Sequence, residues 1–256
     1  MAGIVSPIAV SLIAFVIILG GALVGALLRH TLPGHHLAED AKDIFRLGTG
    51  LVGTIAALVL SLLIASAKTS YDTQSSQVQH MTANIVLLDR LLAQYGPEAR
   101  PIRDLMRRAV GPLVDRIWRE NGARSANDAP FEATAVAEDA FAKIGELAPQ
   151  TDAQRSLKSR AIAVTTDLAQ TRLLLFEQDK SIPMPFLAVL VFWLAIIFMS
   201  FSLFARLNPT IVTGLVVFAL SASAAIFLVL EMSQPFAGLM QISRAPLRNA
   251  LAPLGP

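Results

Sequence analysis

The residues of this sequence that could carry chemistry are few, and the first candidate is a glycine motif. Gly48, Gly50 and Gly53 have the G-x-G-x-x-G spacing of dinucleotide-binding loops. In those loops the glycines follow a β-strand and open a soluble helix, so that backbone N–H groups face a pyrophosphate. Here they begin a long uncharged apolar run and no strand pattern precedes them. The motif therefore does not predict a nucleotide site.

A second candidate is the cluster of histidines and carboxylates between residues 35 and 43. His36 and Asp40 are four residues apart and would share one face of a helix, where they could contribute to a divalent metal site. The alternative is structural. Asp40 would fall in the first turn of a helix that follows the Pro33-Gly34 turn, where the helix dipole favours negative charge. We keep His36 and Asp40 as metal-ligand candidates beside that alternative.

The rest of the chain offers no catalytic arrangement. No Ser/His/Asp set or pair of carboxylates can be assembled from the pattern, and the absence of cysteine excludes thiolate ligands, disulfides and cysteine nucleophiles. We therefore expect neither a cofactor nor enzymatic activity. With 21 Lys and Arg against 19 Asp and Glu, the net charge of +2 leaves no basic surface for nucleic acid.

The elements that must position these residues are membrane helices. Of the 256 residues, 54% are hydrophobic and only 16% are charged, and the mean hydropathy is +0.57. Four runs contain no ionisable side chain, and each is long enough to cross the hydrocarbon layer, which takes about 20 helical residues. These runs are residues 4–28, 47–67, 185–205 and 211–230. The sequence predicts an all-α membrane protein with four spans.

A polar insert at residues 68–182 separates the second and third spans. We divide the chain into residues 1–67, 68–182, 183–230 and an amphipathic tail, 231–256. The insert is helical by pattern, because apolar residues recur at intervals of three and four. One stripe is Val78, Met81, Ile85, Leu88 and Leu92, on a helix that continues the second span and ends at Gly96-Pro97; a second is Ile102, Leu105, Ala109, Leu113 and Ile117.

Small residues form two further stripes at helical spacing. In the second span they are Gly50, Thr54, Ala57, Ser61 and Ala65, and in the first span they are Gly21 and Gly25. Small side chains allow another helix backbone to approach closely. For Gly21 and Gly25 this indicates helix packing. The second-span stripe can face identical helices or a pore in an oligomer, or it can pack within one subunit, and the sequence leaves both interpretations open.

The spans also constrain the class of transport. Pumps and proton-coupled carriers generally need an ionisable group inside the membrane, and the four runs contain no Asp, Glu, Lys, Arg or His. A passive pore has no such requirement, because weak dipoles and hydrophobic constrictions can select and gate. Basic residues near the span ends are almost equally divided between the two sides and do not decide the orientation.

Three segments carry a resemblance to a known family. They are HHLAEDAKDIFRLGTGLVGTIAALVLSLLIASAKTSYDTQ, LLDRLLAQYGPEARPIRDLMRR and QPFAGLMQISRAPLRNAL. Together they resemble the bestrophin-like family of bacterial membrane proteins, which is distantly similar to bestrophins. Bestrophins are oligomeric, typically pentameric, ion channels whose second span lines the pore and whose insert is cytosolic.

The resemblance implies a multi-pass protein of the bacterial inner membrane with a cytoplasmic helical insert. It implies a homo-oligomer, a pentamer by the same likeness, that conducts small inorganic ions, with anions favoured. It assigns the pore lining to the helix at residues 47–67 and to its extension through Lys68, Ser70, Asp72 and Gln74. Within the span, the pore-lining candidates are Gly50, Thr54, Ala57, Ser61 and Ala65. The alternative is a membrane-anchored helical sensor or scaffold whose insert binds a ligand or a partner protein.

Overall fold

The computed structural model describes residues 6–33, 39–120, 132–177, 184–205 and 208–250. Regular structure in these residues is helical throughout, in agreement with the predicted all-α class. The elements are α1 (Pro7–Thr31), α2 (Glu39–Tyr95), η2 (Pro97–Ala99), α3 (Arg100–Glu120), α4 (Glu132–Glu146), α5 (Asp152–Glu177), α6 (Met184–Phe204), α7 (Pro209–Met232) and α8 (Ala245–Arg248).

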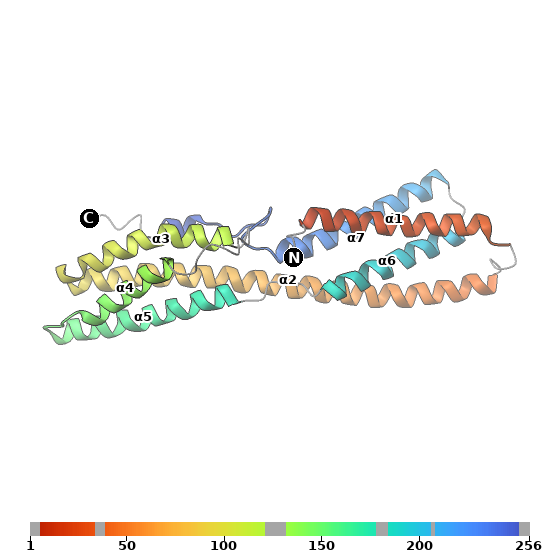
Figure 1. Cartoon of the computed structure of the whole chain (residues 1–256). Helices are drawn as coiled ribbons and strands as arrows, with labels where there is room; N and C mark the ends of the chain where they lie inside the picture. Colours follow the sequence, from red (N-terminus) through yellow and green to blue (C-terminus); the bar gives the residue numbers. More distant parts are fainter. Residues whose placement is uncertain (1–5, 34–38, 121–131, 178–183, 206–207, 251–256) are drawn as a thin grey trace. The chain divides into compact units, whose positions relative to one another are not determined.

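The helices are distributed over two compact units (Figure 1). The membrane unit comprises Met1–Ser70 and Lys180–Ser233, and the insert unit comprises Tyr71–Asp179 and Gln234–Pro256. Helix α2 has 57 residues and contributes its first part to the membrane unit and the remainder to the insert unit. The tail after α7 belongs to the insert unit, so this unit is built from two segments of the chain.

Each of the four helices of the membrane unit is long and apolar enough to span a bilayer. Their starts are fixed by local capping where the sequence supplies it. The Ser6 hydroxyl accepts a hydrogen bond from the Ala9 N–H (3.1 Å) ahead of α1, and the Asn208 side chain accepts one from the Ile211 N–H (2.9 Å) ahead of α7. In both cases a proline follows the capping residue, at the first helical position where its missing N–H costs nothing.

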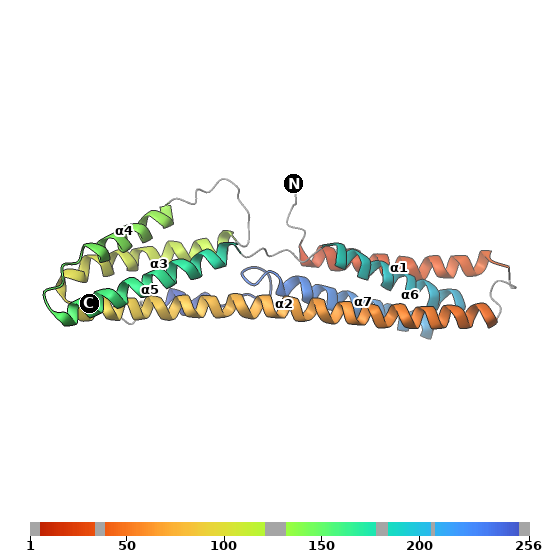
Figure 2. The ribbon, with the colours of Figure 1, turned by 90° about the horizontal axis from the view of Figure 1, so that it is seen from below.

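Helix α1 packs against both α6 and α7, and Figures 1 and 2 show these three helices side by side. Ile18, Ile197 and Ala219, one from each helix, meet in one buried cluster. A second cluster joins α2 to α6 and α7 and includes Ala56, Leu190 and Ile226. The other faces of these helices stay apolar and exposed, as expected of a surface that meets lipid or another subunit.

In the insert unit the predicted stripe of α2 is confirmed. Val78, Met81, Ile85, Leu88 and Leu92 are all buried. The helix ends at Tyr95, and Gly96 follows with φ of 130°, a backbone conformation that residues other than glycine rarely adopt. The sequence therefore located both the core face of this helix and its end.

The predicted stripe of α3 was wrong in its middle positions. Its buried residues are Ile102, Met106, Val110, Val114 and Ile117, whereas Leu105, Ala109 and Leu113 are only partly buried. The face that packs inward is thus displaced by one residue. Both candidate faces carry apolar side chains at helical spacing, so the packing of neighbouring helices decides between them.

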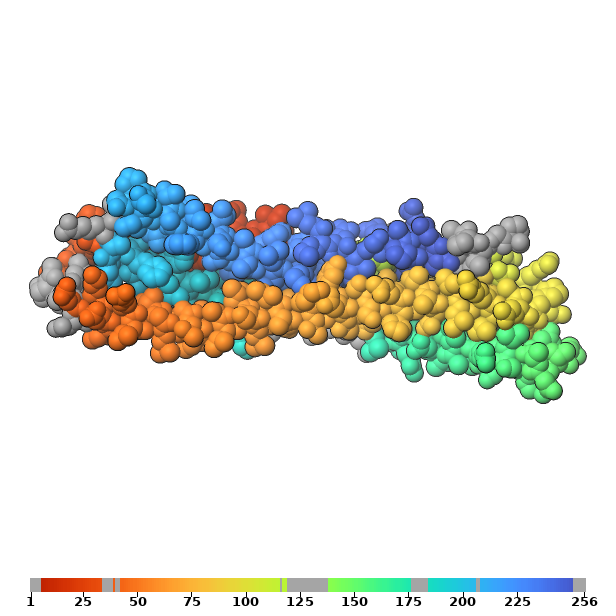
Figure 3. All heavy atoms as spheres, turned by 180° about the vertical axis from the view of Figure 1, so that it is seen from behind, coloured from red at the N-terminus to blue at the C-terminus, as the bar shows by residue number. Residues whose placement is uncertain are grey.

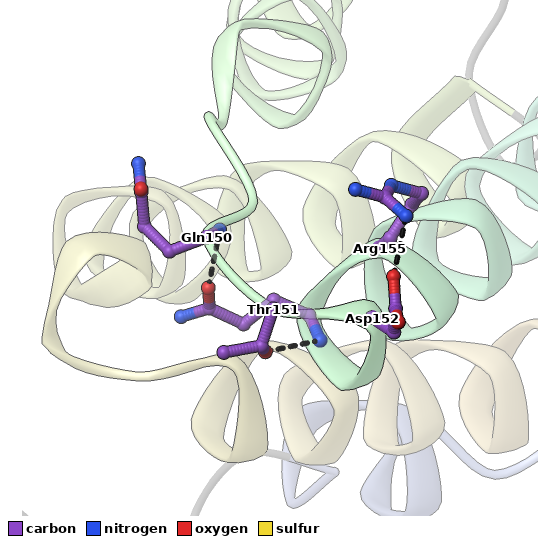
Figure 4. Close-up of polar contacts among 5 residues, drawn as sticks. Gln150, Thr151, Asp152 and Arg155 are labelled. Carbon is purple, nitrogen blue, oxygen red and sulfur yellow. Dashed lines mark hydrogen bonds and ion pairs between the residues drawn. The ribbon is translucent and has the colours of Figure 1, made fainter.

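The turn between α4 and α5 is held by side-chain caps (Figure 4). The Thr151 hydroxyl accepts from the Gln154 N–H (3.1 Å), and the Gln154 side-chain oxygen accepts from the Gln150 N–H (2.8 Å). This resembles a capping box, in which the first turn of a helix and the preceding residues satisfy each other. The Gln154 side-chain amide also donates to the Tyr95 carbonyl oxygen (3.1 Å), which fixes this turn to the end of α2.

The C-terminal segment packs into the core of the insert unit through Trp118 of α3. The indole Nε1–H donates to the Ile242 carbonyl oxygen (3.1 Å), and the ring meets Phe236 edge to face with centroids 5.3 Å apart. The Arg244 guanidinium lies 5.8 Å from the centre of the same indole ring. An indole with both an apolar body and a satisfied N–H is well suited to anchor such a segment.

Candidate functional site

The part of α2 that belongs to the membrane unit has one face against its own subunit. Ala56, Leu63 and Ala67 are buried in the cluster formed with α6 and α7. Small residues at two of these three positions let the neighbouring helices approach the α2 backbone. This face explains how a single subunit holds α2 in place.

The predicted small-residue stripe lies on a different face. Gly50, Thr54, Ala57, Ser61 and Ala65 are all exposed. Figure 3 shows much of this part of α2, in orange, uncovered on the side that is viewed. At 100° per residue the stripe is turned far from Ala56 and Leu63. Within one subunit, the described helices therefore leave these five residues exposed.

The polar atoms of the stripe are satisfied without help from another helix. The Thr54 hydroxyl donates to the Gly50 carbonyl oxygen (2.9 Å), and the Ser61 hydroxyl donates to the Ala57 carbonyl oxygen (2.8 Å). Such bonds to the preceding turn allow hydroxyls to sit in apolar surroundings. Each oxygen keeps a lone pair that an outside donor or a cation can use.

A leucine stripe lies beside the small residues. Leu51, Leu58 and Leu62 have relative exposures of 65%, 66% and 66%. In the membrane unit α2 thus presents three faces: one against its own subunit, one of small residues and one of large aliphatic side chains. Large exposed apolar faces on a helix of this kind are suited to contact lipid or another copy of the chain.

Gly21 and Gly25 lie where α1 crosses α6. A Cβ added to Gly21 would overlap the carbonyl oxygen of Ala195, and one added to Gly25 would overlap that of Met199. Neither obstacle is a flexible side chain, so the crossing needs glycine at both positions. By contrast, a Cβ added to Gly20 would meet no atom within 4 Å.

The metal-ligand candidates lie largely outside what the structure describes. His36 is outside the described residues, and Asp40 is in the first turn of α2 with its side chain outside them. Among the described residues, no group of three or more His, Asp or Glu side chains is arranged to hold a metal ion.

Sequence reasoning missed a groove between α2 and α6. It has a volume of about 560 Å³, and its lining includes Lys42, Phe45, Arg46, Gly50, Gly53, Phe201 and Phe204. The sequence does show two cations, four residues apart, just before an uncharged run. Nothing in the sequence indicates that the end of α6 lies beside them.

The insert unit contains a buried ion pair that was also missed. Arg103 of α3 donates from Nε and Nη2 to the two carboxylate oxygens of Asp89 in α2, each at 2.9 Å. The hydrogen bond to Asp89 raises the pKa of Arg103 above its usual value, against the lowering effect of burial. The guanidinium therefore stays charged, and the pair is a fixed structural element rather than a group poised to release a proton.

A polar hollow of about 450 Å³ lies between α2 and α5 of the insert unit. It is lined by Asp72, Thr73, Ser76, Gln77, His80 and Thr171. Its lining is mainly hydroxyls, one amide, one imidazole and one carboxylate, which can exchange hydrogen bonds with a small polar molecule.

A comparison of the sequence with models of protein families agrees with this architecture of four apolar helices and a helical insert. The bestrophin-like domain model matches residues 16–247. The chain belongs to the bestrophin-like family. The matched region contains most of α1 and all of α2 to α7, so the family assignment covers both units.

Solved structures show the same fold for this bestrophin-like chain. A point variant of a bacterial bestrophin homologue from Klebsiella pneumoniae superposes with a TM-score of 0.65 at 14% identity, covering 94% of this chain and 97% of the other. A second variant gives 0.65 at 15% identity, with 98% of each chain covered. A third structure of this homologue gives 0.61 at 16% identity, with 92% and 97% covered. No match was found among curated protein sequences.

Proposed function

We propose that this chain is the subunit of a homo-oligomeric ion channel in which the α2 helices surround a central axis. The observation that carries the proposal is the exposed stripe of Gly50, Thr54, Ala57, Ser61 and Ala65, beside a face of α2 that is buried in its own subunit. Family membership adds to it, since bestrophins are oligomeric channels. A closed ring of copies would bring the stripes together at one axis.

The two exposed faces of α2 have different partners in this arrangement. The small residues face the axis, where they leave room for a permeant ion and its water. Leu51, Leu58 and Leu62 then contact the neighbouring copy, which removes their large apolar area from lipid and water. A pentamer is the number of subunits that the family resemblance favours.

Conduction in this proposal is passive. The apolar stretch of α2 at residues 47–67 has no ionisable side chain, so no group is available there to couple ion movement to proton transfer. An apolar constriction can instead open and close to water. We accordingly propose no catalytic activity for this chain.

The permeant ion could be an anion or a cation, and a different observation favours each. The family resemblance favours anions. The hydroxyls of Thr54 and Ser61 favour cations, because their protons are donated to carbonyl oxygens of α2 and their oxygens remain as acceptors. The sign of the reversal potential across a bilayer with a KCl gradient distinguishes the two, since K⁺ and Cl⁻ selectivity move it in opposite directions.

The experiment that tests channel function uses purified full-length protein. Its mass in detergent, from light scattering, is expected to correspond to several copies, and proteoliposomes are expected to show K⁺ or Cl⁻ flux down a gradient without any energy source. A monomeric protein, or liposomes no more permeable than protein-free ones under either gradient, would contradict the proposal.

A second candidate function is a membrane-anchored sensor or scaffold. The observation in its favour is the polar hollow between α2 and α5, which could accept a small ligand. Under this reading, ligand binding to the insert unit is independent of any current. A small polar ligand that raises the melting temperature of a protein with no flux activity would support it over the channel.

A further inference from the structure

The α2–α6 groove lies mostly outside the proposed conduction path. Of the residues assigned to the pore, Gly50 alone is among those that line the groove. Its remaining lining comes from the start of α2 and the end of α6, two segments of the same unit. Figure 1 shows the start of α2 and the end of α6 toward the same end of the membrane unit. The groove therefore needs an explanation of its own.

The lining of the groove is amphipathic. Lys42 and Arg46 are one helical turn apart on α2, and both are exposed. Aromatic rings follow: Phe45 and Phe204 contact each other with centroids 5.2 Å apart, and Phe201 lies on the same wall. Among the described residues, no carboxylate lines the groove. Two cations beside an apolar surface match a molecule with an anionic head and a hydrocarbon body.

The two glycines that line the groove, Gly50 and Gly53, leave room for such a body. A Cβ added to Gly53 would meet only the Ile197 side chain, at 3.9 Å, and one added to Gly50 would meet nothing within 4 Å. The glycines are not needed for close helix packing here, in contrast to Gly21 and Gly25. They instead keep the groove deep enough for an acyl chain.

The position of the groove along the helices points to a membrane lipid. Arg46 immediately precedes the uncharged run 47–67, and α6 ends at Phe204. Cations at the end of an apolar run extend toward the headgroup layer, and basic pockets between membrane helices bind anionic headgroups. A phosphate group complements both Lys42 and Arg46.

We propose that the α2–α6 groove binds one anionic phospholipid from the surrounding leaflet. The phosphate lies between Lys42 and Arg46, and an acyl chain lies along Phe201 and over Gly53. Comparing the binding of phosphatidylglycerol and phosphatidylcholine with identical acyl chains distinguishes this proposal from non-specific lipid binding. Of the two, only phosphatidylglycerol has a headgroup with a net negative charge.

Native mass spectrometry of the intact oligomer, titrated with each lipid, tests the charge requirement. The unmodified protein is expected to retain phosphatidylglycerol in preference to phosphatidylcholine. The double variant Lys42→Gln/Arg46→Gln should bind phosphatidylglycerol about 30-fold more weakly and lose the preference, because each cation near a headgroup layer contributes about 1 kcal/mol. A matched variant, Arg90→Gln/Arg100→Gln, removes the same charge from exposed positions of the insert unit and should bind as the parent does.

The shape requirement is tested by filling the groove. Gly53→Leu should weaken phosphatidylglycerol binding, while Gly48→Leu, at an exposed glycine of the same helix with open space around it, should not. Circular dichroism melting of each variant identifies those that fold as the parent does. Equal retention of the two lipids by the unmodified protein, or unchanged binding by both the charge and the Gly53 variants, would overturn the proposal. Loss of the oligomer in Gly53→Leu with lipid binding intact would assign the groove to a second copy instead.

Discussion

The guanidinium of Arg103 and the carboxylate of Asp89 form two parallel hydrogen bonds of 2.9 Å, and the Asp89 side chain is completely buried while that of Arg103 is 19% exposed. The two residues join α2 to α3 inside the insert unit. Because one partner reaches water and the other does not, removing each should have a different effect on stability.

We expect Arg103→Ala to destabilise the protein by about 3–5 kcal/mol, since it leaves a carboxylate buried without its charged partner. Asp89→Ala should cost less, because the guanidinium can turn toward solvent. The exposed pair Arg155 and Asp152 supplies the control, and Arg155→Ala should cost less than about 1 kcal/mol. Urea unfolding followed by circular dichroism measures all three; similar costs for Arg103→Ala and Arg155→Ala would show that burial does not matter here.

Tyr95 is expected to make stability depend on pH in the alkaline range. It lies in the insert unit at the end of α2, and burial, with a smaller contribution from the charge of Glu98, raises the pKa of its phenol above 10.0. Below pH 10 the phenol is protonated in both states and its contribution is fully present. As the pH rises toward the pKa of the folded state, the unfolded chain releases its proton first, so stability falls.

The variant Tyr95→Phe removes this dependence. Among the described residues the Tyr95 hydroxyl is buried without a hydrogen-bond partner, so its loss should also raise stability near neutral pH by about 1 kcal/mol. Melting temperatures between pH 8 and pH 11 measure both effects. A parallel decline with pH in the parent and the variant would mean that other groups cause it.

Gly25→Ala should weaken the crossing of α1 and α6, because a methyl group would overlap the Met199 carbonyl oxygen. Overpacking of this kind costs about 1–3 kcal/mol. Gly20→Ala is the matched control: it has open space and gains helix propensity, so its stability should be equal or slightly higher. The measurement is the melting temperature in detergent, and equal values for the two variants would indicate that α1 shifts at little cost.

Features that depend on residues of a single helix could be predicted from the sequence, whereas contacts between helices could not. The core stripe of α2 at Val78 and Met81 follows from spacing alone, because only one face of that helix carries such a stripe. On α3 both Leu105 and Met106 are apolar, so tertiary packing chooses Met106. The Asp89–Arg103 pair and the α2–α6 groove combine residues from different helices, and periodicity within one helix contains no information about such partners.

Bulky residues on the small-residue stripe should block conduction. Ala57→Leu and Ser61→Leu place branched side chains on the face that we assign to the axis, and flux in proteoliposomes should fall at least severalfold. Ala224→Leu is the matched control, since Ala224 is also a small exposed residue of the membrane unit but lies on α7 rather than α2. Flux that is unchanged in Ala57→Leu and Ser61→Leu would remove this face of α2 from the pore wall.

The side of the membrane that holds the insert unit can be read with single cysteines, because the chain has none of its own. Asp139→Cys is on the exposed surface of α4, and Thr31→Cys is at the exposed end of α1. Along the chain one membrane crossing, residues 47–67, separates these positions, so they must lie on opposite sides. For a cytoplasmic insert, an impermeant maleimide added to spheroplasts should label Thr31→Cys, and it should label Asp139→Cys only after permeabilisation. The reverse pattern would place the insert outside the cytoplasm and favour the sensor over the channel, while labelling of both positions in intact spheroplasts would contradict the four-span topology itself.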